Sequence, residues 1–191
     1  MSLRLQEPRS GPSLDIEELL SNSIIVDKDL IVELYMGFEK LLRFVGGLLY
    51  TSAKKAGEGM AERMRQRGLL GEGNAADVLF WSFVVSGYAE EVEIVKVELK
   101  GKETRLEVHA KGTLLGSRLK SKKPVDQPLA GFLAGWLEKS YGARVDARET
   151  ACQARGDPAC VFEIKIKKRV DELKQLEGKR YSRSELTRSK A

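Results

Sequence analysis

The sequence of 191 residues is 42% hydrophobic and 32% charged, with a formal net charge of +5 at pH 7. This length and apolar content support one globular domain with a buried core, and no apolar run reaches the roughly 18 residues that a membrane span requires. The first residues lack the apolar segment of a secretory signal, so we expect a cytoplasmic protein with no membrane span, whose thiols stay reduced.

The positive charge is concentrated at the C-terminal end. Residues 165–191 contain ten Lys and Arg against four Asp and Glu, so the rest of the chain is close to neutral. This distribution argues against specific nucleic-acid binding by the body of the protein. It predicts three parts: a disordered N-terminus over residues 1–13, a single domain over 14–167, and a basic tail over 168–191. The two Asn and five Gln are few, as in thermophilic proteins.

Helical spacing dominates residues 30–67, where Phe38, Leu41 and Leu48 belong to one predicted apolar face. Asp27 or Asp29 is expected to cap this region. The pair Gly46-Gly47 is expected to divide it into two helices, because two glycines cost about 2 kcal/mol relative to alanine. Before it, the pattern over residues 14–33 suggests a short helix and a short strand.

A second helix is predicted from residue 75 to 87, with Asn74 as its cap. It is apolar almost all round, which is typical of a helix buried on every side. Phe80, Trp81 and Phe83 bring three large rings into this helix. These rings either fill the core or form one wall of an apolar ligand pocket.

Two strands with period-two alternation follow, over residues 95–100 and 105–111. Ile94 is out of phase with Val95, which predicts a β-bulge there. The single histidine, His109, falls on the polar face and is expected to be solvated.

The third predicted helix begins near Pro128 and ends at Gly142. Its apolar side includes Phe132 and Trp136. Gly131 and Gly135 lie one turn apart, so this helix can press closely against the sheet or against a partner helix.

Period-two patterning continues on both sides of the turn Arg155-Gly-Asp-Pro158, which predicts a β-hairpin. Consistent faces place Cys160 opposite Ala151, Phe162 opposite Glu149 and Ile164 opposite Ala147. In this register Glu149 points into the core, whereas a slip of one residue would bury Arg148 and Thr150 instead.

A buried carboxylate without a partner is costly. Cys152 begins the turn and can curl back, so Glu149, Cys152 and Cys160 are expected to converge. Zinc accepts thiolate and carboxylate ligands in a tetrahedral shell and would satisfy all three. Two alternatives stay open: a disulfide between the cysteines, or two small buried thiols without a metal.

Together the elements predict an α+β fold, with an antiparallel sheet of about four strands packed against a helical layer. The pattern Glu149-x-x-Cys152, a Gly-Asp-Pro turn and Cys160-x-Phe-Glu, with the helix Gly131-Phe-Leu-Ala-Gly135-Trp-Leu, resembles the 4-vinyl-reductase domain family. The resemblance is most specific over residues 100–166. The resemblance implies a fold like that of TRAPP-type tethering subunits and haem nitric-oxide-binding domains. The family also includes archaeal proteins described as hydrocarbon-binding.

Sensor members of that family hold zinc through a Glu-x-x-Cys-x7-Cys set and one upstream cysteine. Glu149, Cys152 and Cys160 match this set, and Asp126 stands where the upstream cysteine would be. The resemblance therefore implies a structural zinc, with an aspartate replacing one thiolate ligand.

The sequence contains no phosphate loop, dinucleotide fingerprint or nucleophile elbow. We therefore expect a non-enzymatic module that binds an apolar or aromatic small molecule. Five aromatic residues are the predicted lining of its site: Phe80, Trp81, Phe83, Phe132 and Trp136. The alternative is a scaffold or protein-interaction subunit without a ligand. We expect a homodimer, which both alternatives allow. In the scaffold, the glycine-faced helix or the first long helix would form its seam.

Overall fold

The computed structural model describes residues 26–41, 45–71 and 73–184, so the predicted N-terminal disorder at 1–13 and the helix and strand expected from residue 14 onward lie largely outside it. Within the described residues the helices and 3₁₀ turns are α2 (Lys28–Leu41), α3 (Val45–Gln66), α4 (Ala75–Val85), α5 (Gln127–Tyr141), η1 (Gln153–Arg155) and η2 (Asp171–Leu176). The strands are β1 (Glu91–Lys100), β2 (Glu103–Lys111), β3 (Val145–Ala151), β4 (Cys160–Ile166) and β5 (Arg180–Ser182).

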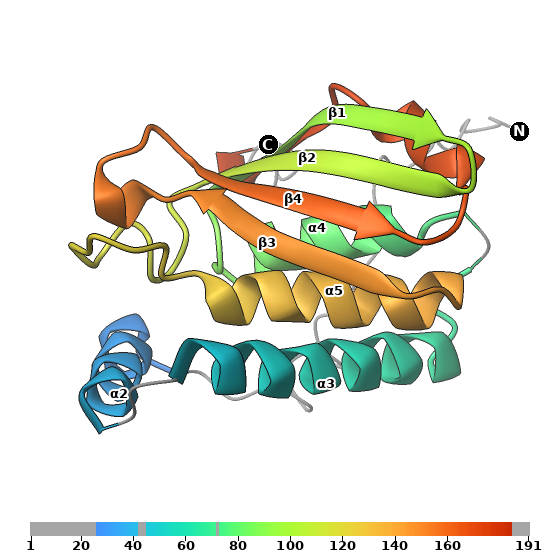
Figure 1. Ribbon diagram of the computed structural model, residues 1–191. Helices are drawn as coiled ribbons and strands as arrows, with labels where there is room; N and C mark the ends of the chain where they lie inside the picture. The colour runs from blue at the N-terminus through green and yellow to red at the C-terminus, as the bar shows by residue number, and fades with distance from the viewer. Residues whose placement is uncertain (1–25, 42–44, 72, 185–191) are drawn as a thin grey trace, which may run out of the picture.

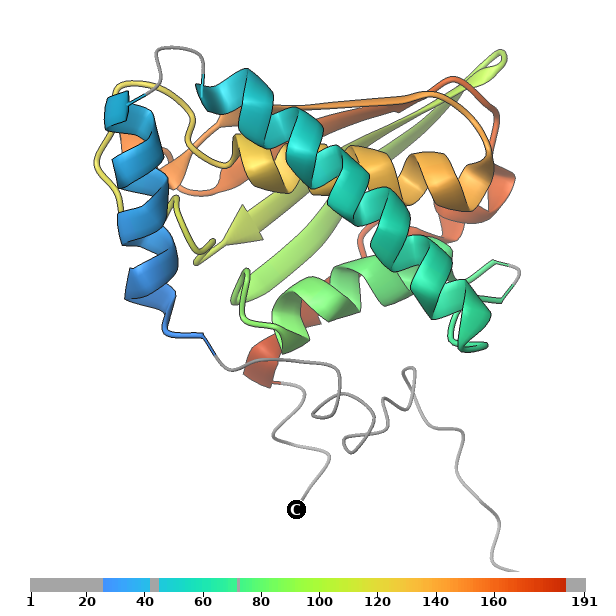
Figure 2. The same ribbon diagram turned by 90° about the horizontal axis from the view of Figure 1, so that it is seen from below.

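The five strands form one antiparallel sheet in the order β3-β4-β2-β1-β5. Figure 1 shows three layers: the sheet, then α4 and α5 beneath it, then α3 beneath α5. Helix α2 stands across the end of these layers where α5 begins, as Figures 1 and 2 both show. The predicted α+β class is confirmed, and the core lies between the inner face of the sheet and the two central helices.

Glycine allows α5 to lie directly on α3. A Cβ atom added to Gly131 would lie 2.2 Å from the carbonyl oxygen of Tyr50, and one added to Gly135 would lie 1.8 Å from that of Lys54. On the facing helix, a Cβ at Gly57 would lie 2.3 Å from the carbonyl oxygen of Phe132. The glycine face of α5 is therefore buried against α3 of the same chain, so of the two expected homodimer seams this one is not available.

Two helices are present, as expected, but α3 already begins at Val45, so Gly46 and Gly47 lie in its first turn rather than between the helices. Because α2 and α3 point in different directions, they do not share one continuous apolar face. The predicted face members Phe38, Leu41 and Leu48 are exposed rather than buried. Asp27 does cap α2, since its carboxylate accepts the backbone N–H groups of Asp29 and Leu30.

The bulge predicted in β1 is present, with the register shifting between Ile94 and Lys96. It leaves Val95 unpaired and partly exposed, and it returns Val97 to the inner face. His109 is half-buried on the outer face and hydrogen-bonds Glu107 at 2.8 Å, so it lies on the face that the alternation predicted.

The predicted basic tail is partly inside the domain. Strand β5 pairs with β1, and η2 packs beside β1, where Lys174 hydrogen-bonds the carbonyl of Val97. The segment buries four apolar side chains: Val170, Leu173, Leu176 and Tyr181. The sheet therefore has one strand more than the roughly four that were expected, and residues 168–184 pack with the domain instead of forming a separate tail. The many charged side chains of this segment face solvent, while its few apolar side chains hold it against the rest of the domain.

Among the described helices, none combines the length and the apolar character needed to cross a bilayer.

Candidate functional site

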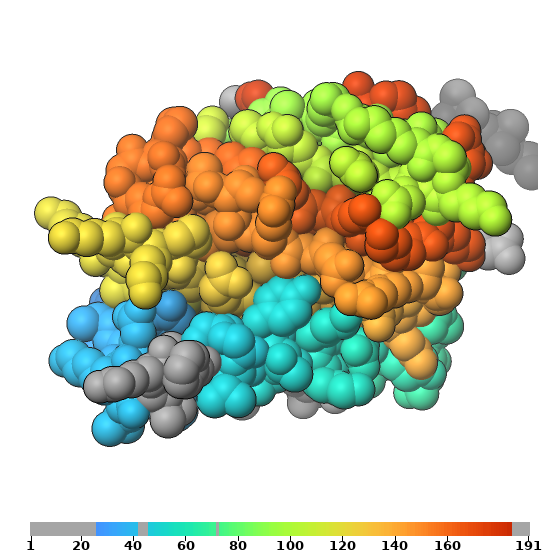
Figure 3. All heavy atoms as spheres, in the orientation of Figure 1, coloured from blue at the N-terminus to red at the C-terminus, as the bar shows by residue number. Residues whose placement is uncertain are grey.

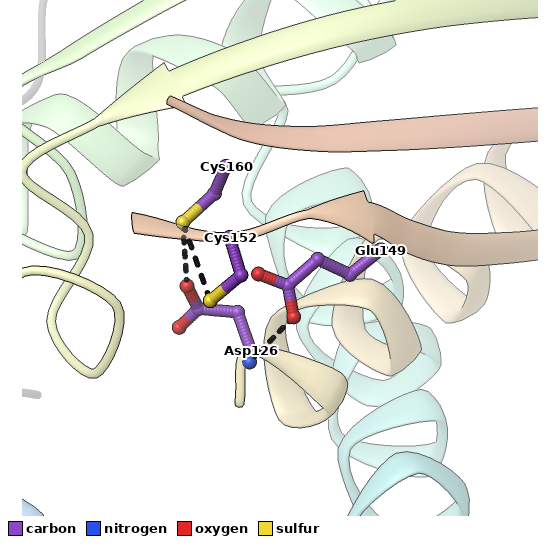
Figure 4. Close-up of side chains that lie close together, drawn as sticks. All are labelled: Asp126, Glu149, Cys152 and Cys160. Atoms are coloured by element: carbon purple, nitrogen blue, oxygen red, sulfur yellow. Dashed lines mark hydrogen bonds between the residues drawn. The ribbon is translucent and has the colours of Figure 1, made fainter. Parts of the chain in front are cut away.

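Four side chains that can carry negative charge meet at the end of the β3–β4 ribbon (Figure 4). Glu149 comes from β3, Cys152 follows that strand, Cys160 begins β4, and Asp126 immediately precedes α5. One ligand atom of each lies within 4.8 Å of the others, and all four residues are buried. We call these four residues the donor cluster. The sequence predicted all four members, and the structure brings them together.

The turn between the strands aims the two sulfurs. The register pairs Glu149 with Phe162 and Ala147 with Ile164, as predicted. It then shifts, so that Ala151 pairs with Val161 rather than with Cys160, and that predicted pair was wrong. The bulge curls the chain inward, which buries the side chain of Cys152 completely.

Two contacts hold the turn closed. The carboxylate of Asp157 accepts the backbone N–H of Cys152 at 2.8 Å, and the backbone N–H of Gln153 donates to the sulfur of Cys160 at 3.3 Å. Gly156 has a φ of 96°, a left-handed conformation that favours glycine. The sequence Arg155-Gly-Asp-Pro158 thus forms the connection that its composition predicted.

Inside the donor cluster the carboxylates are unequally satisfied. The Oδ2 atom of Asp126 accepts hydrogen bonds from the Thr113 hydroxyl at 2.6 Å and the Cys160 thiol at 3.2 Å. The Oε2 atom of Glu149 accepts the backbone N–H of Asp126 at 2.8 Å. The Oε1 atom of Glu149 is buried and has no hydrogen-bond partner among the described residues. A buried acceptor without a partner is costly, so this atom points to a missing ligand.

Sequence reasoning missed Thr113 and Gly116. Thr113 is fully buried and contacts both Asp126 and Cys160. A Cβ at Gly116 would lie 2.6 Å from the sulfur of Cys160 and 2.8 Å from Oδ2 of Asp126, so only glycine leaves room for the cluster. Both residues lie in a loop of Gly, Ser and Lys without a periodic pattern, where sequence offers no signal for an inward-facing side chain.

Two of the four cluster residues, Glu149 and Cys160, hold their protons strongly. Burial raises the pKa of Asp126 to about 6, and burial, followed by the neighbouring Cys152 thiol and the charge of Asp126, raises the pKa of Glu149 to about 9. The hydrogen bond from Cys160 lowers the pKa of Cys152 to about 5, and the same bond with burial raises the pKa of Cys160. No cationic side chain pairs with either carboxylate among the described residues. Protons or a metal ion must therefore neutralise this buried set.

The donor set matches zinc. Two sulfurs and two carboxylate oxygens are a suitable tetrahedral shell, and the Sγ atoms of Cys152 and Cys160 lie 4.0 Å apart, close to the spacing of two thiolates on one zinc. Both cysteines are free in the structure. The unpartnered Oε1 of Glu149 and the space left by Gly116 fit an ion at the centre of these atoms.

The five aromatic residues predicted to line a ligand site form two separate packed groups, each of which includes side chains of α4. Phe83 contacts Phe132, which contacts Trp136, with ring centroids 5.7 and 6.2 Å apart. On the other side, Phe80 and Trp81 pack against the ring of Tyr181 from β5. Phe80 and Trp136 have no exposed surface, and the Trp136 indole donates to the carbonyl of Ala75 at 3.0 Å. Ligand contact by these five residues stays a prediction.

An apolar pocket of about 220 Å³ lies elsewhere, between α2, the start of α3, the start of α5 and the segments flanking the sheet. Its walls are almost entirely hydrocarbon and aromatic: Ile31, Leu34, Tyr35, Phe38, Leu49, Tyr88, Leu114, Leu115, Pro128 and Leu129. Its one charged lining residue is Asp126 of the donor cluster. We call it the apolar pocket. Figure 2 shows α2 standing at this end of the domain, and in Figure 3 the loop after β2 projects above α2.

A family model described as the V4R domain matches residues 107–166, which include most of β2, all of α5 and the whole donor cluster. The chain carries a V4R domain. The family resemblance seen in the sequence is thereby confirmed. No curated protein matches the chain significantly in sequence.

Solved structures extend the likeness of this V4R protein beyond the matched span. The phenol-responsive sensory domain of the transcription activator PoxR with phenol is 19% identical, at a TM-score of 0.59, over 75% of this chain and 76% of that chain. A vinyl-4-reductase family protein from Methanocaldococcus jannaschii is 20% identical, at a TM-score of 0.50, over 82% and 89%.

A trafficking protein particle complex subunit 3 from Naegleria fowleri, covalently bound to palmitic acid, is 13% identical, at a TM-score of 0.53, over 75% and 96%. The TM-scores, at identities below 25%, show a likeness of fold alone, and the expected likeness to the fold of TRAPP-type subunits is confirmed. The likeness to haem nitric-oxide-binding domains stays a prediction.

Proposed function

We propose that this V4R protein is a non-catalytic module that binds a small apolar or aromatic molecule in the apolar pocket, next to a structural metal. The apolar pocket is the observation that carries the proposal, because preformed concave sites with apolar walls and few polar groups are typical of ligand sites. The fold neighbours support it: one is a phenol-responsive sensory domain, and another holds palmitic acid.

The size of the apolar pocket limits the ligand. An engineered apolar cavity of about 150 Å³ is enough to bind benzene. The 220 Å³ available here suits a substituted single ring or a short hydrocarbon chain. Leu34 and Phe38 are about half exposed at its edge, so a ligand can enter past them without unfolding the core.

Zinc is the proposed occupant of the donor cluster. Asp126, Glu149, Cys152 and Cys160 would hold it, and once bound it would supply a cross-link between β3, β4 and the start of α5. Thr113 and the backbone N–H of Gln153 would orient the ligand atoms through their hydrogen bonds to Asp126 and Cys160. All four protein ligands are buried, which favours a structural role over a catalytic one.

Zinc affinity is expected to rise with pH. Glu149, with a pKa of about 9, and Cys160, with a raised pKa, both hold protons at neutral pH and must release them to bind the metal. Between pH 6 and pH 8 the association constant should increase by about tenfold to a hundredfold per pH unit, corresponding to one or two released protons. Competition titrations with a chelating dye at several pH values measure this slope. A flat profile would mean that the metal does not displace these protons.

Filling the apolar pocket is expected to abolish ligand binding. We expect Ile31→Trp to weaken binding of an apolar single-ring probe such as p-cresol at least tenfold, because the indole occupies the space that the ring needs. Isothermal titration calorimetry on the zinc-loaded protein measures the effect. The matched control is Leu41→Trp on the same helix, at a position 81% exposed and outside the pocket, which is expected to bind as the unchanged protein does.

The same titration with Phe132→Leu tests the five aromatic residues, since Phe132 joins Phe83 to Trp136 outside the apolar pocket. Loss of binding in this variant but not in Ile31→Trp would transfer the ligand site to the aromatic groups. No binding of any apolar probe would overturn the proposed function.

A homodimeric scaffold without a ligand is the second candidate. It rests on the exposed apolar side chains of α2 and the start of α3, among which Leu30, Leu41 and Leu48 lie outside the pocket walls. Exposed apolar surface of this kind often marks a contact between chains. Native mass spectrometry reports the oligomeric state together with bound zinc and ligand. A dimer that carries metal but no ligand and takes up no apolar probe would favour the scaffold.

A further inference from the structure

We propose that two copies of this chain associate through the outer faces of their sheets, where two adjacent rows of charged side chains on one copy complement the same two rows on the other. The outer face is the face of the sheet that is turned away from α4 and α5. This inference does not depend on the proposed function, because the residues of the outer face belong to neither the apolar pocket nor the donor cluster.

The outer face has no covering layer within the described residues. In Figure 1 the described α-helices all lie on one side of the sheet, which leaves the other side open. A hollow of about 540 Å³ lies on this open side. It is lined by Leu106, Ala147 and Ile164 together with eight charged residues: Lys96, Glu98, Arg105, Glu107, Asp146, Arg148, Glu163 and Lys165.

Strand pairing arranges these eight charges in two rows, each of which crosses four strands from β3 to β1. The first row, which we call the Arg148 row, has the signs plus, minus, minus, plus and consists of Arg148, Glu163, Glu107 and Lys96. The second row, which we call the Asp146 row, has the signs minus, plus, plus, minus and consists of Asp146, Lys165, Arg105 and Glu98. Every strand therefore carries opposite charges in the two rows, and the eight charges sum to zero.

Within one chain the centre of this face is unfavourable. Glu163 of β4 is directly opposite Glu107 of β2, so two carboxylates stand side by side. The next pair along the same strands, Lys165 and Arg105, is again of like charge. Like charges directly opposite each other on paired strands are destabilising.

Neighbouring side chains relieve this repulsion only in part. Lys165 and Arg105 share one carboxylate, that of Glu103, at 3.0 and 3.5 Å. Lys167 binds the same carboxylate at 2.7 Å, so the cations there outnumber it. Glu107 contacts His109 at 2.8 Å, which carries a charge only when it is protonated. A partner that presents the reverse order of charges would therefore stabilise both central pairs.

A second copy of the chain presents that order. A two-fold rotation about an axis parallel to the rows lays the Arg148 row of one copy on the Asp146 row of the other, with each strand over the same strand. Glu163 then faces Lys165 of the second copy, and Glu107 faces Arg105 of the second copy. The two outer strands bring opposite charges together in the same way. Because the contact is isologous, each of these pairs occurs twice.

The predicted contact is small and polar, so we expect a weak dimer. β3 and β4 have seven residues each, and four strands of this length at about 4.8 Å spacing form a face of about 450 Å² per copy, at the low end for protein interfaces. Complementary charges fix the register of such a contact and speed association more than they add affinity. The hollow leaves room for water that bridges the charged groups.

Salt dependence distinguishes this contact from an apolar one. Sedimentation velocity over a concentration series is expected to show a monomer–dimer equilibrium. Its dissociation constant is expected to rise at least tenfold from about 50 mM to about 500 mM NaCl, because salt screens exposed charge pairs. A dimer formed through the exposed apolar side chains of α2 and the start of α3 would not weaken in this way, since it has no charge pairs to screen.

Two double variants test the rows directly. Glu107→Lys with Glu163→Lys makes every charge of the Arg148 row positive, and Arg105→Glu with Lys165→Glu makes every charge of the Asp146 row negative. Each variant alone brings like charges together at the centre of its own dimer, so its dissociation constant is expected to rise at least tenfold. In an equimolar mixture both pairs of facing rows are complementary, so a heterodimer is expected to form at least as tightly as the unchanged dimer.

Native mass spectrometry of the mixture, with one variant labelled with heavy nitrogen, separates the heterodimer from the two homodimers. Circular dichroism verifies that each variant is folded. Where a double variant does not fold, the single substitutions Glu107→Lys and Arg105→Glu provide the same test on one strand. The control is Leu48→Ser in α3, on the far side of the molecule, which is expected to leave the dimer unchanged.

An unchanged protein that stays monomeric throughout the concentration series in about 50 mM NaCl would overturn the inference. So would two folded charge variants that do not pair when mixed. A dimer that is lost in Leu48→Ser but kept in both charge variants would place the interface on α2 and α3 instead. Each of these results leaves ligand binding in the apolar pocket untouched, so the proposed function is tested separately by its own titrations.

Discussion

Alanine in place of Gly135 is expected to destabilise the protein by about 3 kcal/mol or more, the upper part of the range for overpacked contacts. The added Cβ would lie 1.8 Å from the carbonyl oxygen of Lys54 and 2.7 Å from its carbonyl carbon. These are backbone atoms of α3, so no rotation of a side chain relieves the clash and the two helices must separate. Urea denaturation followed by circular dichroism measures the loss, and failure of Gly135→Ala to fold would be its extreme form.

The matched control is Gly37→Ala. Gly37 lies inside α2, and nothing stands within 4 Å of the position that its Cβ would take. Here the same substitution is expected to stabilise the protein by about 0.5–1 kcal/mol, because alanine is the better helix former. If the two substitutions changed stability equally, the close α3–α5 contact would be contradicted. Both changes would then be explained by the higher helix propensity of alanine alone, with no clash at Gly135.

Serine in place of Cys160 is expected to remove the metal and to lower the melting temperature by about 10 °C. The sulfur of Cys160 lies within reach of Asp126 and Cys152, and a serine hydroxyl is a poor zinc ligand. Zinc contributes about 10–16 kcal/mol to the folding of zinc-finger peptides. This domain has its own core, so we expect a smaller loss of about 3–5 kcal/mol, which gives the stated shift for a chain of this size. Elemental analysis and differential scanning calorimetry measure the two effects.

Glu163→Gln provides the comparison for this experiment. Glu163 lies on β4, three residues from Cys160, but faces solvent and pairs with Arg148. Its substitution is expected to leave one zinc per chain and to change stability by less than about 1 kcal/mol. Equally low metal content in the unchanged protein and in Cys160→Ser would remove zinc from this site. The donor cluster would then be two thiols and two carboxyl groups that share protons.

The elements with strong periodicity could be predicted from sequence. Period-two alternation on both sides of Arg155-Gly-Asp-Pro158 was enough to predict β3, β4 and the inward direction of Glu149, because the faces of a strand alternate strictly. The same logic predicted the bulge in β1. Helix α5 followed from Pro128 and Gly142, whose backbone preferences mark helix ends.

Docking of weakly patterned segments could not be predicted in this way. Residues 168–184 contain many charges and only a few apolar side chains, so composition favoured a tail. The structure buries Leu173 of η2 and Tyr181 of β5, because a few well-placed contacts anchor a segment whose charges remain in solvent. Likewise, the sequence does not reveal whether the glycine face of α5 packs against a helix of the same chain or of a second chain.

The local sequence pattern determined that Glu149, Cys152 and Cys160 converge at the end of a hairpin, since residue type and alternation are properties of neighbours along the chain, whereas Asp126 was indicated only by the resemblance to the family. Only the tertiary structure decided that Thr113 and Gly116 enclose the cluster and that Asp126 also forms the floor of the apolar pocket. Those relations join α2, α5 and the loop after β2, which are far apart in sequence and meet only through tertiary packing, of which the close glycine contact between α3 and α5 is one part.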